Sequence, residues 1–329
     1  MKRGVVVIAG LLLCGGIGWW WLRAPRPATS AGQAPDLTAP RPEKAPAALP
    51  AGAPQESAAT RLEGATSPAA AERNDYARFH ESKDFYAYAE ELLPLAKQGD
   101  ASAQFYLSSA LSYCEGLYDW YFIEYTQNGT RRQRTLDEAL QLTAERKVFQ
   151  PDDVRDIQQR CQKLRSIDPP PFGTSREWLD AAIALGFPMA QASEALNLAL
   201  QGQGRSNPEK AQAARGEARQ LALVALRTRD PMVMAQMGDI AANLAGEDSG
   251  KARIVRWAWP LAACQREANC RIMGDWMRLF CNIDTQCQPF ETPVDIIRRQ
   301  AGNDYDEVER MARELNEKLD AGTLGEGDL

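Results

Sequence analysis

The chain has 329 residues, of which 44% are hydrophobic and 25% are charged, and its formal net charge at pH 7 is −6. This acidic balance argues against a protein that binds nucleic acid through a basic face. The single histidine, His80, excludes a metal site built from several histidines and leaves one candidate for a histidine general base. We interpret His80 as an ordinary helix residue, and we predict no catalytic residue, no cofactor and no metal site.

The N-terminal segment predicts a membrane anchor. Residues 4–22 carry no charge, follow Lys2 and Arg3, and end in three tryptophans and a leucine. Such a segment spans about 28 Å as a helix, close to the ~30 Å hydrocarbon core of a bilayer. The positive-inside rule places the rest of the chain outside the cytoplasm. We therefore predict a single-pass anchor at residues 1–23 in a bacterial inner membrane, with the C-terminal domain in the periplasm. A cleaved signal peptide and a lipoprotein modified at Cys14 are the alternatives.

Residues 24–72 have the composition of a disordered tether. Alanine and proline make up 25 of these 49 residues, and no aromatic residue occurs among them. A segment of this kind buries too little apolar surface to offset the entropy of ordering it. Its proline content favours an extended, semi-rigid spacer.

Residues 73–329 have the periodicity of an all-α domain. Apolar residues recur at intervals of three and four, as at Phe85, Tyr88 and Leu92 near the start and at Val308, Met311 and Leu315 near the end. We find no alternating run long enough to predict a strand.

Internal repetition is the most informative feature of this domain. Three segments align, at residues 95–116, 183–202 and 225–246, and each contains a turn followed by an Ala-Gln pair. We expect a second helix in each to end at Gly116, Gly202 or Gly246. A fourth copy follows from the recurrence of Met-Gly-Asp 36 residues later, at residues 273–275.

The first segment carries the clearest motif, QGDASAQFYLSSALSYCEG. It resembles the Sel-one-like repeats, which are related to tetratricopeptide repeats. The residues that match the pattern are Gly99, Asp100, Ala103, Gln104, Leu107 and Gly116; Ser108, Phe187 and Arg229 depart from it. The resemblance implies a short α-solenoid of paired antiparallel helices that serves as a binding scaffold, often in bacterial envelopes. Residues 117–171 contain no copy and form an insert. An irregular helical bundle is the alternative.

Six cysteines in the exported region are interpreted as disulfide partners: Cys114, Cys161, Cys264, Cys270, Cys281 and Cys287. Six cysteines allow 15 pairings. A turn after the first helix of the fourth copy would let Cys264 meet Cys270, and Cys281 and Cys287 flank a similar segment. Cys114 and Cys161 would then pin the insert to the first repeat. A zinc site of the last four cysteines is the alternative, although their spacing is longer than that of usual metal pairs.

One segment of the insert is a candidate interaction surface. It contains Tyr118, Trp120, Tyr121, Phe122 and Tyr125, with Arg131, Arg132 and Arg134 downstream. Clustered aromatics could anchor a protein partner or stack on a glycan. The alternative interpretation is that they pack the insert into the core.

Two classes of function follow from the sequence. The first is a membrane-tethered periplasmic scaffold that binds another envelope protein and is not an enzyme. The second is a membrane-anchored foldase or a cell-wall enzyme that uses carboxylates. The anchor and spacer resemble those of lipase foldases, but the Arg-x-x-Phe-Asp-Tyr motif of that family does not occur. The oligomeric state is left open.

Overall fold

The computed structural model describes residues 75–126, 130–146, 151–167, 171–204, 207–246, 250–266, 270 and 292–329. The predicted anchor and tether, the fourth repeat motif, and Cys281 and Cys287 lie outside the described residues. The described part of the chain is mostly helical, as the spacing of its apolar residues predicts. Within that part, no helix is long and apolar enough to cross a membrane.

The first helices form a compact corner around aromatic side chains. They are α3 (Asp75–Glu81), α4 (Phe85–Lys97) and α5 (Ala101–Tyr113). The carboxylate of Asp84 accepts hydrogen bonds from the backbone N–H groups of residues 86 and 87 at 2.9 and 3.1 Å, which fixes the start of α4. Phe79 stacks on Phe85 with ring centroids 5.1 Å apart.

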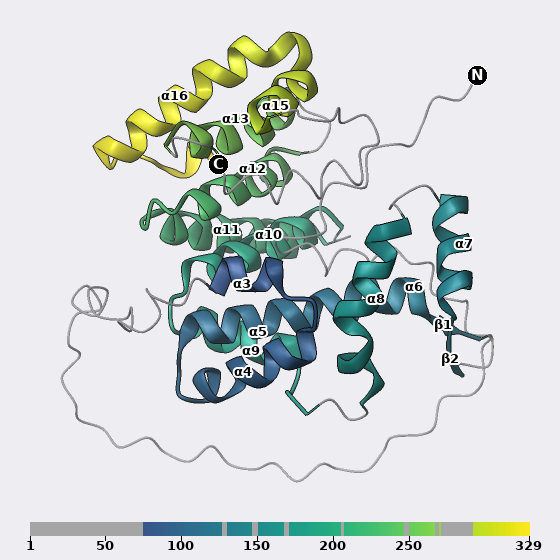
Figure 1. Cartoon of the computed structure of the whole chain (residues 1–329). Helices are drawn as coiled ribbons and strands as arrows, with labels where there is room; N and C mark the ends of the chain where they lie inside the picture. Colours follow the sequence, from purple (N-terminus) through teal and green to yellow (C-terminus); the bar gives the residue numbers. More distant parts are fainter. Residues whose placement is uncertain are drawn as a thin grey trace, which may run out of the picture.

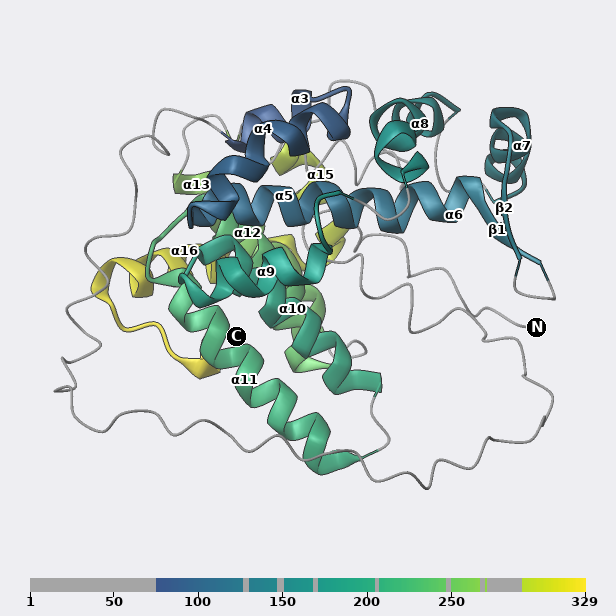
Figure 2. The same cartoon turned by 90° about the horizontal axis from the view of Figure 1, so that it is seen from below.

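The end of α5 differs from the prediction. Gly116 does not terminate the helix, because the chain continues through a π-helical turn, η1 (Cys114–Tyr118), into α6 (Asp119–Phe122). Cys114, Leu117 and Tyr118 are buried on this turn. Their packing outweighs the roughly 1 kcal/mol by which one glycine disfavours a helix. Figure 2 shows α5 and α6 as one long rod that leads to the strands.

The insert then forms a short β-hairpin, which the sequence did not predict. Strands β1 (Ile123–Tyr125) and β2 (Arg131–Gln133) pair antiparallel, with Glu124 opposite Arg132. Helices α7 (Leu136–Arg146) and α8 (Pro151–Ser166) follow, and α8 packs back against η1 and α4. Strands of three residues are too short to show an alternating pattern in the sequence.

The remaining helices continue the stack. They are α9 (Ser175–Ala184), α10 (Pro188–Gly204), α11 (Pro208–Leu226), α12 (Pro231–Ala245), α13 (Gly250–Arg266), α15 (Pro293–Ala301) and α16 (Tyr305–Ala321), with the short turns η2 (Gly302–Asp304) and η3 (Glu326–Asp328). Along the stack, α5 packs on α9, α10 on α11 and α12, α12 on α13, and α13 on α16 (Figure 1). The arrangement is helical and repeat-like.

The turns between paired helices repeat their backbone geometry. Gly99, Gly186 and Arg229 have φ values of 88°, 76° and 55°, and each stands two residues before the helix that follows. When the segments are aligned on this turn, Gln104 and Gln191 coincide, whereas Gln236 stands two residues further along its helix. The Ala-Gln pair of the third segment is therefore not equivalent to the other two. Of the predicted ends, Gly246 directly follows α12, and Gly202 lies inside α10.

The same alignment explains a small residue in each second helix. Ser108, Ala195 and Gly238 occupy one position, four residues after the positions of Gln104, Gln191 and Met234. The Ser108 hydroxyl donates to the Ser175 carbonyl at 2.7 Å, at the start of α9. A Cβ on Gly238 would stand 2.3 Å from the Arg256 carbonyl oxygen in α13. In the first and third segments, this position therefore lies against the helix that packs next, α9 or α13.

Candidate interaction surface on the disulfide-linked insert

A disulfide fastens the insert to the helix stack. Cys114 of η1 is bonded to Cys161 of α8, their Cα atoms are 5.3 Å apart, and the two residues are 47 positions apart in the sequence. Cys264 and Cys270 are also bonded, with Cα atoms 4.4 Å apart. In the part of the chain that the structure describes, no three metal-binding side chains gather into a possible metal site.

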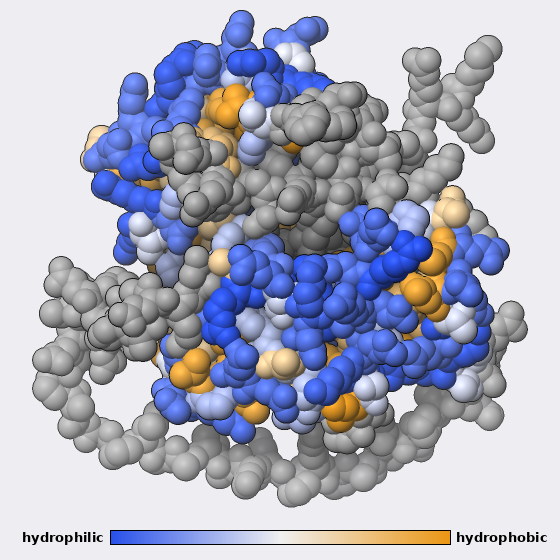
Figure 3. Space-filling view, viewed as in Figure 1, coloured by the Kyte–Doolittle hydropathy of each residue, from blue (hydrophilic) through white to orange (hydrophobic). Residues whose placement is uncertain are grey.

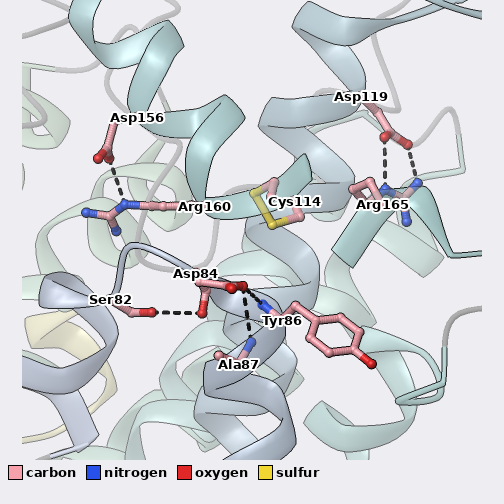
Figure 4. Close-up of a disulfide and its surroundings, with 10 residues drawn as sticks. Ser82, Asp84, Tyr86, Ala87, Cys114, Asp119, Asp156, Arg160 and Arg165 are labelled. Atoms are coloured by element: carbon pink, nitrogen blue, oxygen red, sulfur yellow. Dashed lines mark hydrogen bonds and ion pairs between the residues drawn. A yellow bond between two sulfur atoms is a disulfide. The ribbon is translucent and has the colours of Figure 1, made fainter. Parts of the chain in front are cut away.

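A largely buried ion pair holds the C-terminal end of α8. Arg165 donates from Nε to one Asp119 carboxylate oxygen at 3.0 Å and from Nη2 to the other at 2.5 Å. Both side chains are less than one-fifth exposed, at 18% and 14%. Two parallel, charge-assisted hydrogen bonds fix orientation as well as distance. Figure 4 shows this pair on one side of the disulfide and Arg160 on the other.

Arg160 joins α8 to the first two helices. It contacts the Asp156 carboxylate at 2.7 Å, donates to the His80 carbonyl at 2.9 Å, and lies over the Phe85 ring at 5.5 Å from its centroid. The His80 ring lies beside Tyr76 and Phe79, with centroids 4.4 and 5.2 Å away. In this setting His80 has a packing role, and its main chain helps to dock α8.

An apolar stripe completes the attachment of α8. Its buried residues are Val154, Ile157, Cys161 and Leu164, spaced three and four apart. Covalent, ionic and apolar contacts thus act together on one helix. The insert is a firmly mounted part of the domain.

The five aromatic residues of the candidate segment have different environments. Tyr118, Tyr121 and Phe122 are buried, and the Tyr118 ring stacks on Phe122 at 4.7 Å between centroids. Burial raises the pKa of the Tyr118 hydroxyl, which accepts a hydrogen bond from the Gln133 amide at 2.8 Å. For these three, packing into the core is the correct interpretation. Trp120 is half-buried, and Tyr125 is 61% exposed.

The three arginines downstream also differ in their environments: two are held by partners within the insert, and one is exposed. Arg134 donates to the carbonyl oxygens of residues 120, 121 and 123 at 3.1 to 3.3 Å, and so caps the end of α6. Arg132 is shared between Glu124 and Glu138, at 2.9 and 2.8 Å. These hydrogen bonds raise the pKa of Arg132 and lower that of Glu138. Arg131 is exposed and has no acidic partner among the described residues.

Tyr125 and Arg131 therefore form the displayed part of the insert, and we call them the hairpin tip. They are paired across the two strands, so their side chains share one face. Tyr125 is the most exposed large hydrophobic residue in the described part of the chain. Two other large hydrophobic residues there are exposed, Ile167 and Leu185. On the face in Figure 3, blue hydrophilic residues cover most of the described surface and orange patches are small and separate. Residue spacing alone could not separate Tyr125 from its neighbours, because its exposure depends on the change from helix to strand at Ile123.

Comparison with protein-family models finds no match, and comparisons with curated proteins and with solved structures find no significant relative.

Proposed function

We propose that this chain is a membrane-tethered periplasmic scaffold of helical repeats, related to the Sel-one-like family, which binds another protein of the cell envelope through its insert. The hairpin tip carries the proposal. An exposed tyrosine and an arginine without an acidic partner among the described residues stand together on a mount fixed by Cys114–Cys161 and by Arg165–Asp119. Tyrosine and arginine are enriched at the energetic centres of protein interfaces.

The rigidity of the mount supports a binding role. A surface that is already ordered loses little conformational entropy when a partner binds, so more of the contact energy appears as affinity. The repeat-like stack supplies the platform, since each unit of such a protein is held mainly by its neighbours.

The disulfide-bonded cysteines support the proposed periplasmic location. Disulfides persist in the periplasm and are rare in the bacterial cytosol. Two bonded pairs among the described residues agree with an anchor at residues 4–22 that exports the domain. The membrane attachment is part of the proposal and rests on the sequence of that segment.

Site-specific photocrosslinking of the full chain in its own membranes tests the proposal. A photoreactive phenylalanine at position 125 is expected to give one discrete adduct with an envelope protein. The same group at Leu185, which is also exposed (48%) but lies at the end of α9, is the matched control and is expected to give none. An Arg131→Glu substitution should weaken the adduct at position 125.

The outcomes separate the scaffold from the alternatives. Adducts at neither position, or equal adducts at both, would contradict a binding site at the hairpin tip. A folding lipase as the crosslinked protein would instead favour the foldase. Glycan fragments on the crosslinked residue would favour a cell-wall enzyme.

A further inference from the structure

The outer edge of strand β2 is an open position for a further strand. Among the described residues this sheet has two strands, so each strand has one edge with no neighbouring strand in that part of the chain. All three residues of β2 are exposed. Open strand edges are ready sites for pairing with another chain, and native proteins usually protect them.

The register shows which backbone groups face this edge. Thr126 donates to the Thr130 carbonyl at 2.9 Å, and Arg134 donates to the Phe122 carbonyl at 2.7 Å. Hydrogen-bonded and non-hydrogen-bonded pairs alternate in an antiparallel ladder, so Glu124–Arg132 is the hydrogen-bonded pair between them. It follows that the N–H and C=O groups of Arg131 and Gln133 point away from β1, toward solvent. Four backbone groups are thus in place for an added strand.

The opposite edge of the hairpin is already in use. On β1, the Ile123 carbonyl accepts a hydrogen bond from the Arg134 guanidinium at 3.1 Å. No contact of this kind is made to the outward backbone groups of β2 within the described residues. The two edges therefore differ, and β2 is the one that can accept a strand.

Side-chain charge indicates the chemistry of the added strand. Arg131 stands on this edge with no acidic partner in the described structure, and the charge of Arg132 is met by Glu124 and Glu138. A carboxylate opposite Arg131 would form a charge-assisted hydrogen bond, which is stronger than a neutral one. A second copy of the hairpin fits poorly, because antiparallel pairing centred on Arg132 would place two Arg132 residues opposite each other.

We infer that the outer edge of β2 binds an extended acidic segment of a partner protein by strand addition, with a carboxylate of that segment opposite Arg131. The inference rests on the proposed scaffold function and specifies its partner by backbone conformation and charge. Backbone hydrogen bonds supply affinity in this mode of recognition, and alternate side chains supply specificity.

Selection of ten-residue peptides from a random phage library on the full-length protein in nanodiscs tests the inference. Peptides that bind the wild type are expected to carry Asp or Glu at a fixed position. Arg131→Pro removes an outward N–H at an edge position that tolerates proline, and should abolish their binding. Arg131→Glu keeps the backbone and should weaken binding at least about tenfold. Arg227→Glu, at an exposed cation after α11, is the matched control and should bind as the wild type does.

Hydrogen exchange supplies an independent measurement. The amides of Arg131 and Gln133 are expected to exchange more slowly when a selected peptide is bound. Selection of apolar or basic peptides, of none, or of acidic peptides that still bind Arg131→Pro would overturn the inference, as would dimerisation through β2. If the photocrosslinker at position 125 captures its partner equally in the wild type and in Arg131→Pro, the scaffold function stands and strand addition fails. If it captures nothing in the wild type, the scaffold function fails.

Discussion

Asp239 is a carboxylate enclosed between α12 and α13. Its side chain is 17% exposed, and its nearest cation is the Arg256 guanidinium, 3.5 Å away. Burial raises the pKa of Asp239 to about 6, and Arg256 opposes this only in part. An unfolded aspartate has a pKa near 3.9, so protonation of Asp239 favours the folded chain. The stabilisation is fully present below about pH 4 and is lost as the pH rises through about 6.

An Asp239→Asn substitution should therefore change the pH dependence of stability. Asparagine does not ionise, so its stability contribution does not change over this pH range. The difference in melting temperature, variant minus wild type, should therefore increase from pH 5 to pH 7.5. Thermal unfolding followed by circular dichroism measures this difference. Asp295→Asn is the control, because hydrogen bonds from Thr292 lower the pKa of Asp295 and its carboxylate stays charged over this range. A difference for Asp239→Asn that is constant or falls with pH would contradict the assignment.

Two tyrosines of the insert offer a direct test of which aromatics belong to the core. Tyr121 is fully buried, and replacing it by alanine should cost about 3–5 kcal/mol of unfolding free energy, as for other large core residues. Tyr125 is 61% exposed, and its replacement should change stability by no more than about 0.5 kcal/mol. Urea unfolding of both variants gives these values. Equal losses would show that Tyr125 packs as Tyr121 does.

At the scale of elements, helices α12 and α13 approach closely at Gly238. An added Cβ would stand 2.3 Å from the Arg256 carbonyl oxygen and 2.9 Å from Cδ of Pro260. Backbone cannot move aside as a side-chain end can, so α12 and α13 would have to separate. The glycine is required for space and not for an unusual backbone conformation.

A Gly238→Ala substitution should lower the unfolding free energy by about 1–3 kcal/mol, as expected for overpacking. Gly216 in α11 is the matched control, because a Cβ there meets nothing within 4 Å. Gly216→Ala should stabilise the chain by up to about 1 kcal/mol through helix propensity. Chemical denaturation of both variants measures the contrast, and the same sign of change in both would contradict close packing at Gly238.

Helices with a clear apolar face were predictable, and elements set by tertiary contacts were not. The apolar faces of α4 and α16 are local features, which periodicity detects. The continuation of helical structure past Gly116 depends on contacts with α8, which lies 35 or more residues further along the sequence. The same holds for Arg134, whose role as a cap of α6 becomes visible only when the hairpin has folded. Sequence placed the candidate site in the insert but could not choose its exposed residues.

At the scale of the whole molecule, the disulfides connect structure with compartment. Protein made with its own N-terminal segment should carry Cys114 bonded to Cys161 and Cys264 bonded to Cys270. Tryptic peptide 98–131 should then be linked to 161–163, and peptide 257–266 to 267–271, in non-reducing mass mapping. A chain that lacks residues 1–23 and stays in the cytosol should yield the same peptides unlinked. Free thiols at all four positions in the membrane-derived protein would contradict both disulfide bonds and the proposed topology.

The bond between Cys114 and Cys161 also determines what happens when the chain is cut. It encloses α6, both strands, α7 and most of α8, and therefore the exposed Arg131 of the hairpin tip. A protease that cleaves after Arg131 produces two polypeptides that remain covalently joined. The nicked protein should migrate at its full mass until a reductant is added. Cleavage within the hairpin thus leaves the helices before and after it in one covalently joined molecule.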